Sequence, residues 1–454
     1  MNISYFISKR IRSDATQSFS STIIKIALTT IAIGLAIMII SVAILKGFTN
    51  NIQNKIFSFG AHIQISKFDD THSFEELPIT INSDLYQNPN KIKEIRHIQA
   101  FCHKTGLLKT DEEVMGVILK GVGKDFDIEN FKNNILEGEF INFSKSTYSK
   151  EIMISKKAAN KLKLEISDEI LMYFVQNPPR YRKLTIAGIY KTMLEEFDDL
   201  MVLADIKLIQ KLNNWPDTLV GGYEIFLHDF NRNENLENVK IKLNNIKVKL
   251  NNIKEKIDIP IVKDWIDYIV KDWIDNIIRI KLQTATDKIF DAMDYDLQLE
   301  TVTSKYIQLF DWLILLNRNV WIFLWFIVLV ATFNIISTLI IMIMERTNMI
   351  GILKAIGATN WQTMKIFLYN GINLIVKGML LGNVIGIGFC TLQKYFQIIP
   401  LDPENYYMDT VPIEWDLTWI LFINIGTFLL ISIILIIPTA IILNIKPINA
   451  IRFD

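Results

Sequence analysis

Four long apolar runs divide this chain, and each approaches the roughly 20 residues that a helix needs to cross a bilayer. The first run is bounded by Lys25 and Lys46, and no small-residue cleavage site follows Leu45, so we expect an anchor and not a cleaved signal. The fourth run contains Pro438, a helix-stopping residue, near its inner end. The pattern predicts transmembrane helices at residues 26–45, 319–344, 365–392 and 415–443.

Basic residues near the spans predict the orientation of the chain. Lysines and arginines precede the first span, lie between the second and the third, and follow the fourth. The connection between the third and fourth spans is mainly acidic. We therefore expect residues 1–25, 345–364 and 444–454 in the cytoplasm, and residues 46–318 and 393–414 on the other side.

Residues 46–318, the inserted domain, are numerous enough to fold around a core of their own. Alternating apolar and polar residues predict strands, and residues 156–162 have a helical pattern. The expected fold class is a membrane α-helical protein with a large mixed α/β (α+β) extracytoplasmic domain between the first and second transmembrane helices. The predicted strands are residues 62–65, 151–154, 184–190, 200–204 and 223–227.

After Phe230 the inserted domain becomes rich in Asn, Lys and Glu, which favours a helix or an extended linker. Two tandem repeats follow, KIKLNNI/KVKLNNI at 240–253 and VKDWIDYI/VKDWIDNI at 262–277. Two copies of a unit do not make a solenoid, so we interpret both as duplications in a tolerant region.

The connection at residues 345–364 has the pattern of a packed helix. Met349, Ile352, Leu353 and Ile356 recur at the three-and-four spacing of one helical face. Gly357 is placed to end the helix in the left-handed conformation, and Thr359 with Gln362 has the capping-box spacing that starts the next helix. An apolar face on a cytoplasmic helix predicts a docking surface for a partner.

Polar and small residues within the spans predict contacts between helices. Gly378, Gly382 and Gly386 form overlapping GxxxG motifs that permit close approach to another helix, whose identity stays open. Lys377 lies within an apolar run, where a charge is costly. We expect it either to reach the cytoplasmic edge or to contact Asn334, Asn424 or a second subunit.

Composition and motifs argue against a catalytic role. Half of the 454 residues are hydrophobic, 21% are charged and the net charge is zero, so nothing indicates nucleic-acid binding. The chain has no P-loop, HExxH, GxSxG or Cys/His cluster, and its five histidines are scattered. Cys102 and Cys390 fall in different predicted compartments, so we expect no internal disulfide. We expect no metal site and no cofactor in this chain.

The residues resemble the FtsX-like permeases of ABC transporters, and the lipoprotein-releasing (Lol-type) branch in particular. The resemblance covers nearly all of the chain. Its most specific part runs from Phe333-Asn334-Ile335-Ile336-Ser337-Thr338-Leu339 into Glu345-Arg346 and the segment 351–358, GILKAIGA. Further matches are Lys46-Gly47-Phe48 after the first span, the segments 60–65 and 188–198, Asp272-Trp273 and the ending 447–452.

This resemblance implies a transport subunit of the bacterial inner membrane that is not itself an enzyme. It implies a second permease, either the same chain or a homologue, and two copies of a cytosolic ABC ATPase, which bind the ATP and Mg. The helix between spans two and three is then the coupling helix that docks in the ATPase. The residues given this role are Glu345, Arg346, Gly351, Leu353, Lys354, Ala355, Ile356, Gly357 and Ala358.

In the lipoprotein-releasing branch, ATP-driven movement extracts a lipoprotein and passes it to a periplasmic chaperone. A protruding loop of one permease binds that chaperone, and the matching positions are Pro178, Pro179, Arg180 and Tyr181. Two prolines stiffen this segment and remove two donors, which favours outward presentation of Arg180 and Tyr181. The segment is shorter than the family's loop, so an ordinary strand connection stays open.

Two other functions stay open. A permease-like mechanotransmitter regulates a cell-wall hydrolase and transports nothing, but such relatives usually have a much smaller outer domain. Efflux of amphiphiles usually involves an ATPase fused before the first span, whereas here that span begins within about 25 residues of the start.

Overall fold

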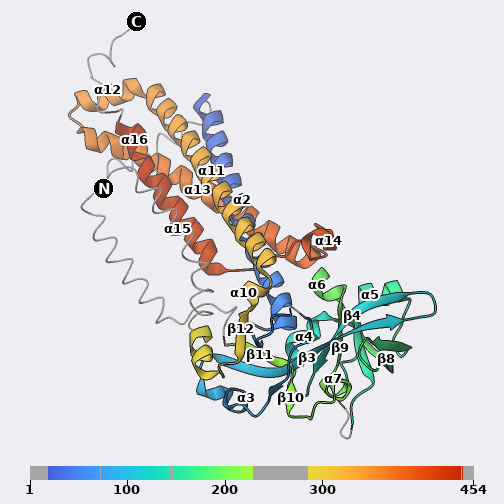
Figure 1. The fold of residues 1–454 in the computed structure, drawn as a ribbon. Helices are drawn as coiled ribbons and strands as arrows, with labels where there is room; N and C mark the ends of the chain where they lie inside the picture. Colours follow the sequence, from blue (N-terminus) through green and yellow to red (C-terminus); the bar gives the residue numbers. More distant parts are fainter. Residues whose placement is uncertain (1–18, 72, 144–146, 229–284, 441, 443–454) are drawn as a thin grey trace. The chain divides into compact units, whose positions relative to one another are not determined.

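The computed structural model describes residues 19–71, 73–143, 147–228, 285–440 and 442, and its elements divide into two compact units (Figure 1). The membrane unit contains the apolar helices, and the inserted domain contains the sheet. The membrane unit comprises Met1–Thr49, Leu315–Leu401 and Thr410–Asp454, and the inserted domain comprises Asn50–Ile314 and Asp402–Asp409.

Four helices are long and apolar enough to cross a membrane, which confirms the four predicted spans. Two of them, α2 and α11, supply residues to both units. The fourth ends in a short separate helix, α16 (Ile436–Thr439). The four are α2 (Phe19–Gly60), α11 (Ile307–Glu345), α13 (Asn360–Phe396) and α15 (Leu417–Ile434).

The helices do not end where hydropathy placed the span boundaries. Helix α2 continues well past Leu45 to Gly60, because Ile52, Ile56 and Phe57 bury a helical face within the inserted domain. Helix α11 begins at Ile307, ahead of the predicted boundary at 319. Helix α15 ends at Ile434, whose carbonyl would otherwise bond to the N–H that Pro438 lacks.

The inserted domain is built on a ten-stranded sheet with the order β12-β1-β11-β3-β4-β9-β6-β8-β5, in which β7 pairs with β3 and β8. Most pairs are antiparallel, whereas β4 with β9 and β6 with β8 are parallel. A separate pair joins β2 (Ile79–Thr80) to β10 (Leu219–Val220). The ten strands are β1 (Ile63–Lys67), β3 (Ile95–Lys109), β4 (Val114–Val122), β5 (Ile135–Gly138), β6 (Glu151–Ser155), β7 (Glu169–Phe174), β8 (Arg180–Tyr190), β9 (Met201–Asp205), β11 (Gly222–Leu227) and β12 (Leu297–Thr301).

Short helices accompany this sheet and complete its core. Helix α5 (Lys156–Leu162) is capped by Ser155, and α7 (Ile206–Asn213) by Asp205, so each starts directly from the end of a strand. Apolar residues of both helices belong to the same buried cluster as the strands. Smaller helices are α3 (Asp84–Gln87), α4 (Ile128–Phe131), α6 (Glu195–Asp198), α10 (Val302–Lys305) and α14 (Pro403–Tyr406), with the 3-10 turns η2 (Pro89–Lys91) and η3 (Lys132–Asn134).

The five predicted strands coincide with β1, β6, β8, β9 and β11, and the predicted helix 156–162 is α5, so these predictions are confirmed. The longest strand, β3, was not predicted. It is buried along most of both faces while carrying histidines and lysines, so it shows no clean alternation. The tandem repeats at 240–277 lie outside the described residues.

Part of the predicted loop at residues 393–414 packs with the inserted domain, since residues 402–409 belong to that unit. Lys55 donates to the carbonyl of Tyr407 at 2.7 Å, and Lys191 pairs with Asp409 at 3.0 Å. These two contacts hold the tip of this connection against α2 and the sheet domain.

Candidate functional site

The connection between the second and third spans is a short helix whose C-terminal end is fixed by hydrogen bonds. Helix α12 (Thr347–Ala355) is followed by Gly357, whose φ is +101°, as predicted. The N–H of Ala358 donates to the carbonyl of Leu353 at 2.9 Å, and that of Gly357 to Lys354 at 3.1 Å, which is a Schellman ending. The predicted capping box of Thr359 and Gln362 is also present. The next helix therefore starts in a fixed direction.

The apolar side chains of α12 divide between the membrane unit and the surface. Ile350 and Gly351 are buried, although neither belongs to the apolar face that was predicted from the sequence. Ile352 and Ile356 are 50% and 79% exposed, and Trp361 on the first turn of α13 is also exposed. We call Ile352, Ile356 and Trp361 the α12 patch.

The other residues assigned to coupling surround this patch. Glu345, Ala355 and Gly357 are exposed, whereas Arg346, Leu353 and Ala358 are half-buried. Lys354 donates to the carbonyl of Ile442 at 2.6 Å, which ties α12 to the end of the fourth apolar segment. The patch is thus carried on a helix that is held at its C-terminal end and, through Lys354, from one side.

The three glycines of α13 lie against the first span, which answers the question that the sequence left open. A Cβ at Gly378 would lie 2.8 Å from the Cβ of Ile31, and one at Gly382 would lie 2.7 Å from the carbonyl oxygen of Ala32. At Gly386 the nearest atom would be the Cα of Ala36, at 3.1 Å. We call this contact the glycine seam, and it leaves no room for a side chain on α13.

The predicted partners of Lys377 within the chain are wrong. Asn424 instead exchanges two hydrogen bonds with Asn383, at 2.7 and 3.0 Å. Lys377 is exposed on α13, and Asn334 accepts the hydroxyl of Thr338 through its backbone carbonyl at 2.8 Å. Over the described ranges, Lys377 has no hydrogen-bond or ion-pair partner, and contact with a second subunit or with the cytoplasmic edge stays a prediction.

The Lys46-Gly47 pair after the first apolar run has a structural explanation. Lys46 forms an ion pair with Asp416, the N-cap of α15, and lies 5.1 Å from the ring centroid of Trp419. A Cβ at Gly47 would lie 2.5 Å from the carbonyl oxygen of Pro412. Glycine is therefore needed where the first span meets the segment that enters the fourth.

The predicted chaperone-docking loop is a short strand connection. Pro178 and Pro179 lie in the turn between β7 and β8, whereas Arg180 and Tyr181 already belong to β8. Arg180 is not presented outward, because its guanidinium donates to the carbonyls of Lys211 and Leu212, the last residues of α7, at 3.1 and 2.8 Å. Tyr181 is 65% exposed.

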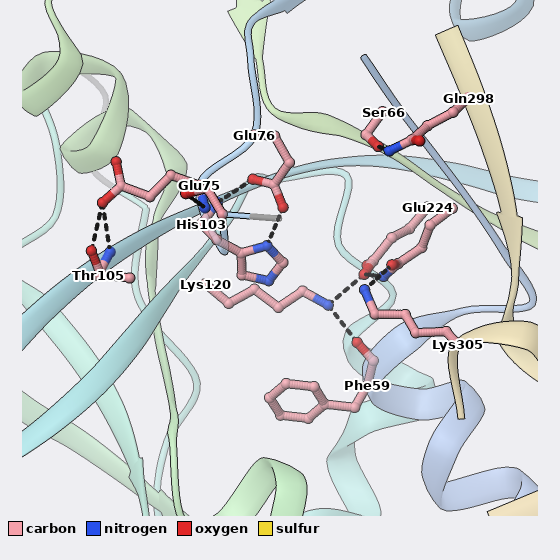
Figure 2. Close-up of polar contacts among 12 residues, drawn as sticks. Phe59, Ser66, Glu75, Glu76, His103, Thr105, Lys120, Glu224, Gln298 and Lys305 are labelled. Carbon is pink, nitrogen blue, oxygen red and sulfur yellow. Dashed lines mark hydrogen bonds and ion pairs between the residues drawn. The ribbon is translucent and has the colours of Figure 1, made fainter. Parts of the chain in front are cut away.

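The structure also contains a buried ion pair that sequence reasoning missed. Lys120 on β4 pairs with Glu224 on β11 at 2.6 Å, and their side chains are 2% and 0% exposed. Figure 2 shows the Lys120 ammonium between this carboxylate and the backbone carbonyl of Phe59. The signal was present in the sequence, because each residue is a lone charge in an apolar strand, VILKGV and YEIFL.

A second group of carboxylates holds the segment before β2 to strand β3. Glu76 accepts from the backbone N–H of His103 at 2.9 Å and lies 2.5 Å from its Nδ1, while Glu75 pairs with Lys104 at 2.7 Å (Figure 2). Burial acts to raise the pKa of Glu76, but the charge and hydrogen bonds of His103 outweigh it and hold the pKa below its ordinary value. The contact between Glu76 and His103 therefore holds the segment before β2 against strand β3.

Catalytic and metal chemistry find no support in the described part of the chain. A cavity of about 430 Å³ beside His103 is lined mainly by apolar groups, among them Phe197, Met201 and Tyr306. No described serine or cysteine is hydrogen-bonded to His103. The described residues also contain no group of three or more His, Cys, Asp or Glu side chains that could hold a metal.

Comparison with known proteins agrees with this architecture. Residues 26–253 match the family model of the MacB-like periplasmic core domain, and residues 321–447 match the FtsX-like permease C-terminal domain. Among solved structures, the periplasmic region of MacB from Actinobacillus actinomycetemcomitans is similar at a TM-score of 0.31 and 8% identity, covering 54% of this chain and 91% of that one. The extracellular domain of the ABC-type transporter YknZ from Gram-positive bacteria gives 0.26 and 14%, over 37% and 83%.

Curated relatives cover almost the whole chain. The lipoprotein-releasing system transmembrane protein LolC of Buchnera aphidicola subsp. Schizaphis graminum is 26% identical over 92% of this chain and 90% of its own length. The protein named LolE in Haemophilus influenzae is 22% identical, over 91% and 90%. With both domain models matched in order along one sequence, the chain belongs to the FtsX-like ABC transporter permeases that carry a MacB-like periplasmic core domain.

Proposed function

We propose that this chain is the permease subunit of an ABC transporter that releases lipoproteins from the inner membrane. The α12 patch carries the proposal, because a membrane protein exposes Ile352 and Ile356 on a helix whose C-terminal end is fixed and which Lys354 ties to the end of the fourth apolar segment. Similarity to proteins named for lipoprotein release over about nine tenths of the chain supports the choice of cargo.

A separate cytosolic ATPase, in two copies, binds the α12 patch and supplies the ATP and Mg, so that the permease itself needs no cofactor. In this arrangement both termini and α12 lie in the cytoplasm, and the inserted domain lies in the periplasm. A second permease, identical or homologous, completes the transporter. The exposed Lys377 on α13 is a suitable contact for it, because a charge in a span needs a polar partner.

The contacts within the chain suggest how a push on α12 is transmitted. The Schellman ending and the capping box join α12 to α13 through a short connection with fixed backbone geometry. The glycine seam packs α13 on α2, so the two helices move together. Helix α2 then continues without interruption to Gly60 in the inserted domain. Movement of the inserted domain releases the lipoprotein to a periplasmic chaperone.

The turn between β7 and β8 offers the chaperone a small surface. Tyr181 is its exposed aromatic side chain, with Pro178 and Pro179 beside it. The Arg180 side chain does not contact the chaperone, because its guanidinium is bound to the end of α7, but this bond helps to position the turn. Chaperone transfer is therefore proposed at Tyr181 and the two prolines.

Replacing both Ile352 and Ile356 with Asp tests the role of the α12 patch. Each apolar anchor in such an interface contributes about 2 kcal/mol, so binding of the ATPase should weaken by at least about 100-fold. The measurement is copurification of the ATPase from native membranes, together with lipoprotein-stimulated ATP hydrolysis. Asn348→Asp is the matched control, because Asn348 is exposed on the same helix but is not part of the patch.

Proteomic identification of what copurifies tests the cargo. Lipoproteins and a second permease support the proposal, whereas a peptidoglycan hydrolase in their place indicates the mechanotransmitter.

Intact ATPase binding and unchanged turnover in the Ile352→Asp, Ile356→Asp variant would show that force does not enter through α12.

A further inference from the structure

The chain enters and leaves the inserted domain through two neighbouring strands. Helix α2 leads into β1, and β12 leads through α10 into α11. Strands β1 and β12 pair directly, with Ile63 opposite Thr301, and the N–H of Val302 donates to the carbonyl of His62 at 3.0 Å. Both long apolar helices are therefore attached to one edge of the sheet.

A buried row of polar side chains starts from this edge and runs across four adjacent strands. Gln64 on β1, Glu224 on β11 and Gln99 on β3 lie opposite one another in register. Both amides donate to the Glu224 carboxylate at 2.8 Å, and Lys120 on β4 completes the row. The carboxylate is thus bound from three strands other than its own.

The last turn of α2 and the short helix α10, which precedes α11, are each bound to this row by a lysine. Lys120 donates to the carbonyl of Phe59 in the last turn of α2, where the helix dipole favours a cation. Its ammonium also lies 5.1 Å from the ring centroid of Phe59. Lys305, two residues before α11 begins, donates to Gln64 at 2.5 Å (Figure 2).

Stability alone does not explain a fully buried ion pair. Removing two charges from water costs several kcal/mol for each ion, and an apolar pair of similar volume is often equally stable. Burial lowers the pKa of Lys120, and the Glu224 carboxylate opposes this effect. Charge-assisted hydrogen bonds differ from apolar contacts in one respect, because they fix direction as well as distance.

We propose that Lys120 and Glu224 form a coupling joint, which fixes the end of α2 to the sheet so that a displacement of the helix moves four strands as one body. Without it, the same displacement is absorbed by bending at Ala61 and His62, which connect α2 to β1. Lys120 and Glu224 are positioning residues, and neither of them contacts cargo. The inference rests on the proposed function, since it concerns the efficiency with which ATP hydrolysis moves the inserted domain.

The first test replaces the pair by apolar residues, Lys120→Met with Glu224→Leu, in the full complex with its copurifying ATPase in proteoliposomes. Assembly and ATP hydrolysis should stay at wild-type level, while lipoprotein released per ATP hydrolysed falls about tenfold. Lys156→Met with Glu137→Leu is the matched control, because that ion pair has a 2.7 Å separation in the same domain but is exposed. Unchanged release per ATP in the Lys120/Glu224 variant would overturn the joint.

A second variant covers the case in which the buried double variant does not assemble. Lys305 is exposed, so Lys305→Met should fold while it removes the bond between α10 and Gln64. We expect a loss of about fivefold in release per ATP, at the low end for a coupling contact. Lys67→Met is its control, since Lys67 on β1 pairs with Asp296 at 3.2 Å away from the row. Equal release by Lys305→Met and wild type would then decide against the proposal.

A distance measurement tests this proposal independently of which cargo the transporter releases. Spin labels at Asn54→Cys on α2 and Lys109→Cys on β3 report the helix-to-sheet distance without any lipoprotein, and the native Cys102 and Cys390 are buried. The distribution should be narrow in the wild type and broad in the apolar double variant. Equal widths would reject the joint even if release is confirmed, whereas a wild-type transporter that releases no lipoprotein would reject only the proposed function.

Discussion

The two halves of α2 are held by opposite kinds of interaction. In the membrane unit, the helix packs on α13 through Gly378, Gly382 and Gly386, and backbone atoms and small side chains approach closely. In the inserted domain, the last turn of the same helix is bound by the buried Lys120, which is held in turn by Glu224. The seam on α13 depends on close packing alone, whereas the last turn of α2 adds a buried charge to the apolar face of Ile52, Ile56 and Phe57.

The difference follows from the solvent that each half meets. Among apolar spans there is little hydrophobic driving force between helices, so close packing through small residues supplies the contact. A folded domain in water can enclose an ion pair among hydrogen-bonding strands, which gives a contact with a fixed direction. The same helix therefore contacts α13 through uncharged residues, and its last turn contacts a buried charged side chain of the sheet.

The largest effect is expected from filling the glycine seam. Gly382→Leu forces a side chain against the carbonyl oxygen of Ala32, which a Cβ would already approach to 2.7 Å, and should cost about 3 kcal/mol or more. Gly388→Leu is the matched control, because a Cβ at Gly388 meets nothing within 4 Å. The measurement is unfolding of the full chain in detergent. Equal loss in both variants would mean that α2 and α13 do not depend on this seam.

An effect of pH that is smaller for each pH unit is expected from His62, just past the end of α2. Burial, aided by the charge of Arg96, lowers the pKa of His62 to about 3, and its Nδ1 accepts the N–H of Leu227 at 3.2 Å, which requires the neutral ring. The unfolded chain binds this proton near pH 6.5, so stability is full above that pH and is lost as pH falls toward about 3.

The slope from this one group approaches about 1.4 kcal/mol per pH unit between those values. Thermal unfolding across this range should show a slope that is shallower by one proton in His62→Asn, while His228→Asn, at an exposed histidine, keeps the wild-type slope. Identical slopes in all three proteins would mean that His62 is protonated in the folded chain.

The smallest effect is expected from the polar pair inside the membrane unit. Asn383 and Asn424 bond to each other between α13 and α15, but such bonds in membrane helices average only about 0.6 kcal/mol. Replacing both with Leu should therefore change stability by far less than Gly382→Leu does. The measurement is unfolding of the two variants in detergent. A larger loss of stability from the Asn pair than from Gly382→Leu would mean that polar contacts stabilise the membrane unit more than close packing does.

The parts that sequence reasoning predicted well depend on interactions between near neighbours. The Schellman ending at Gly357 and the capping box of Thr359 and Gln362 involve residues no more than five apart, so the pattern of residue types is sufficient. Helices α2 and α11 extend beyond the predicted spans, because hydropathy reports where apolar residues stop and not where backbone hydrogen bonding stops.

The candidate sites divide in the same way. The α12 patch was anticipated from helical spacing, although burial of Ile350 shows that one side of that helix packs inside the chain. Arg180 was expected to point outward, and only the position of α7 explains why it does not. Lys377 was predicted to contact Asn334, Asn424, a second subunit or the cytoplasmic edge, and in the structure Asn424 bonds to Asn383 instead.

The sequence by itself determined the number of spans, the class of the inserted domain and the fixed C-terminal end of α12, because these depend on residue type and local spacing. Only the tertiary structure decided which helix the glycines meet and that two lone charges in apolar strands form one pair. Lys120 and Glu224 are 104 residues apart, and their pairing exists only because the strand order places β4 and β11 on either side of β3. Contacts of that range are fixed by the packing of the whole sheet.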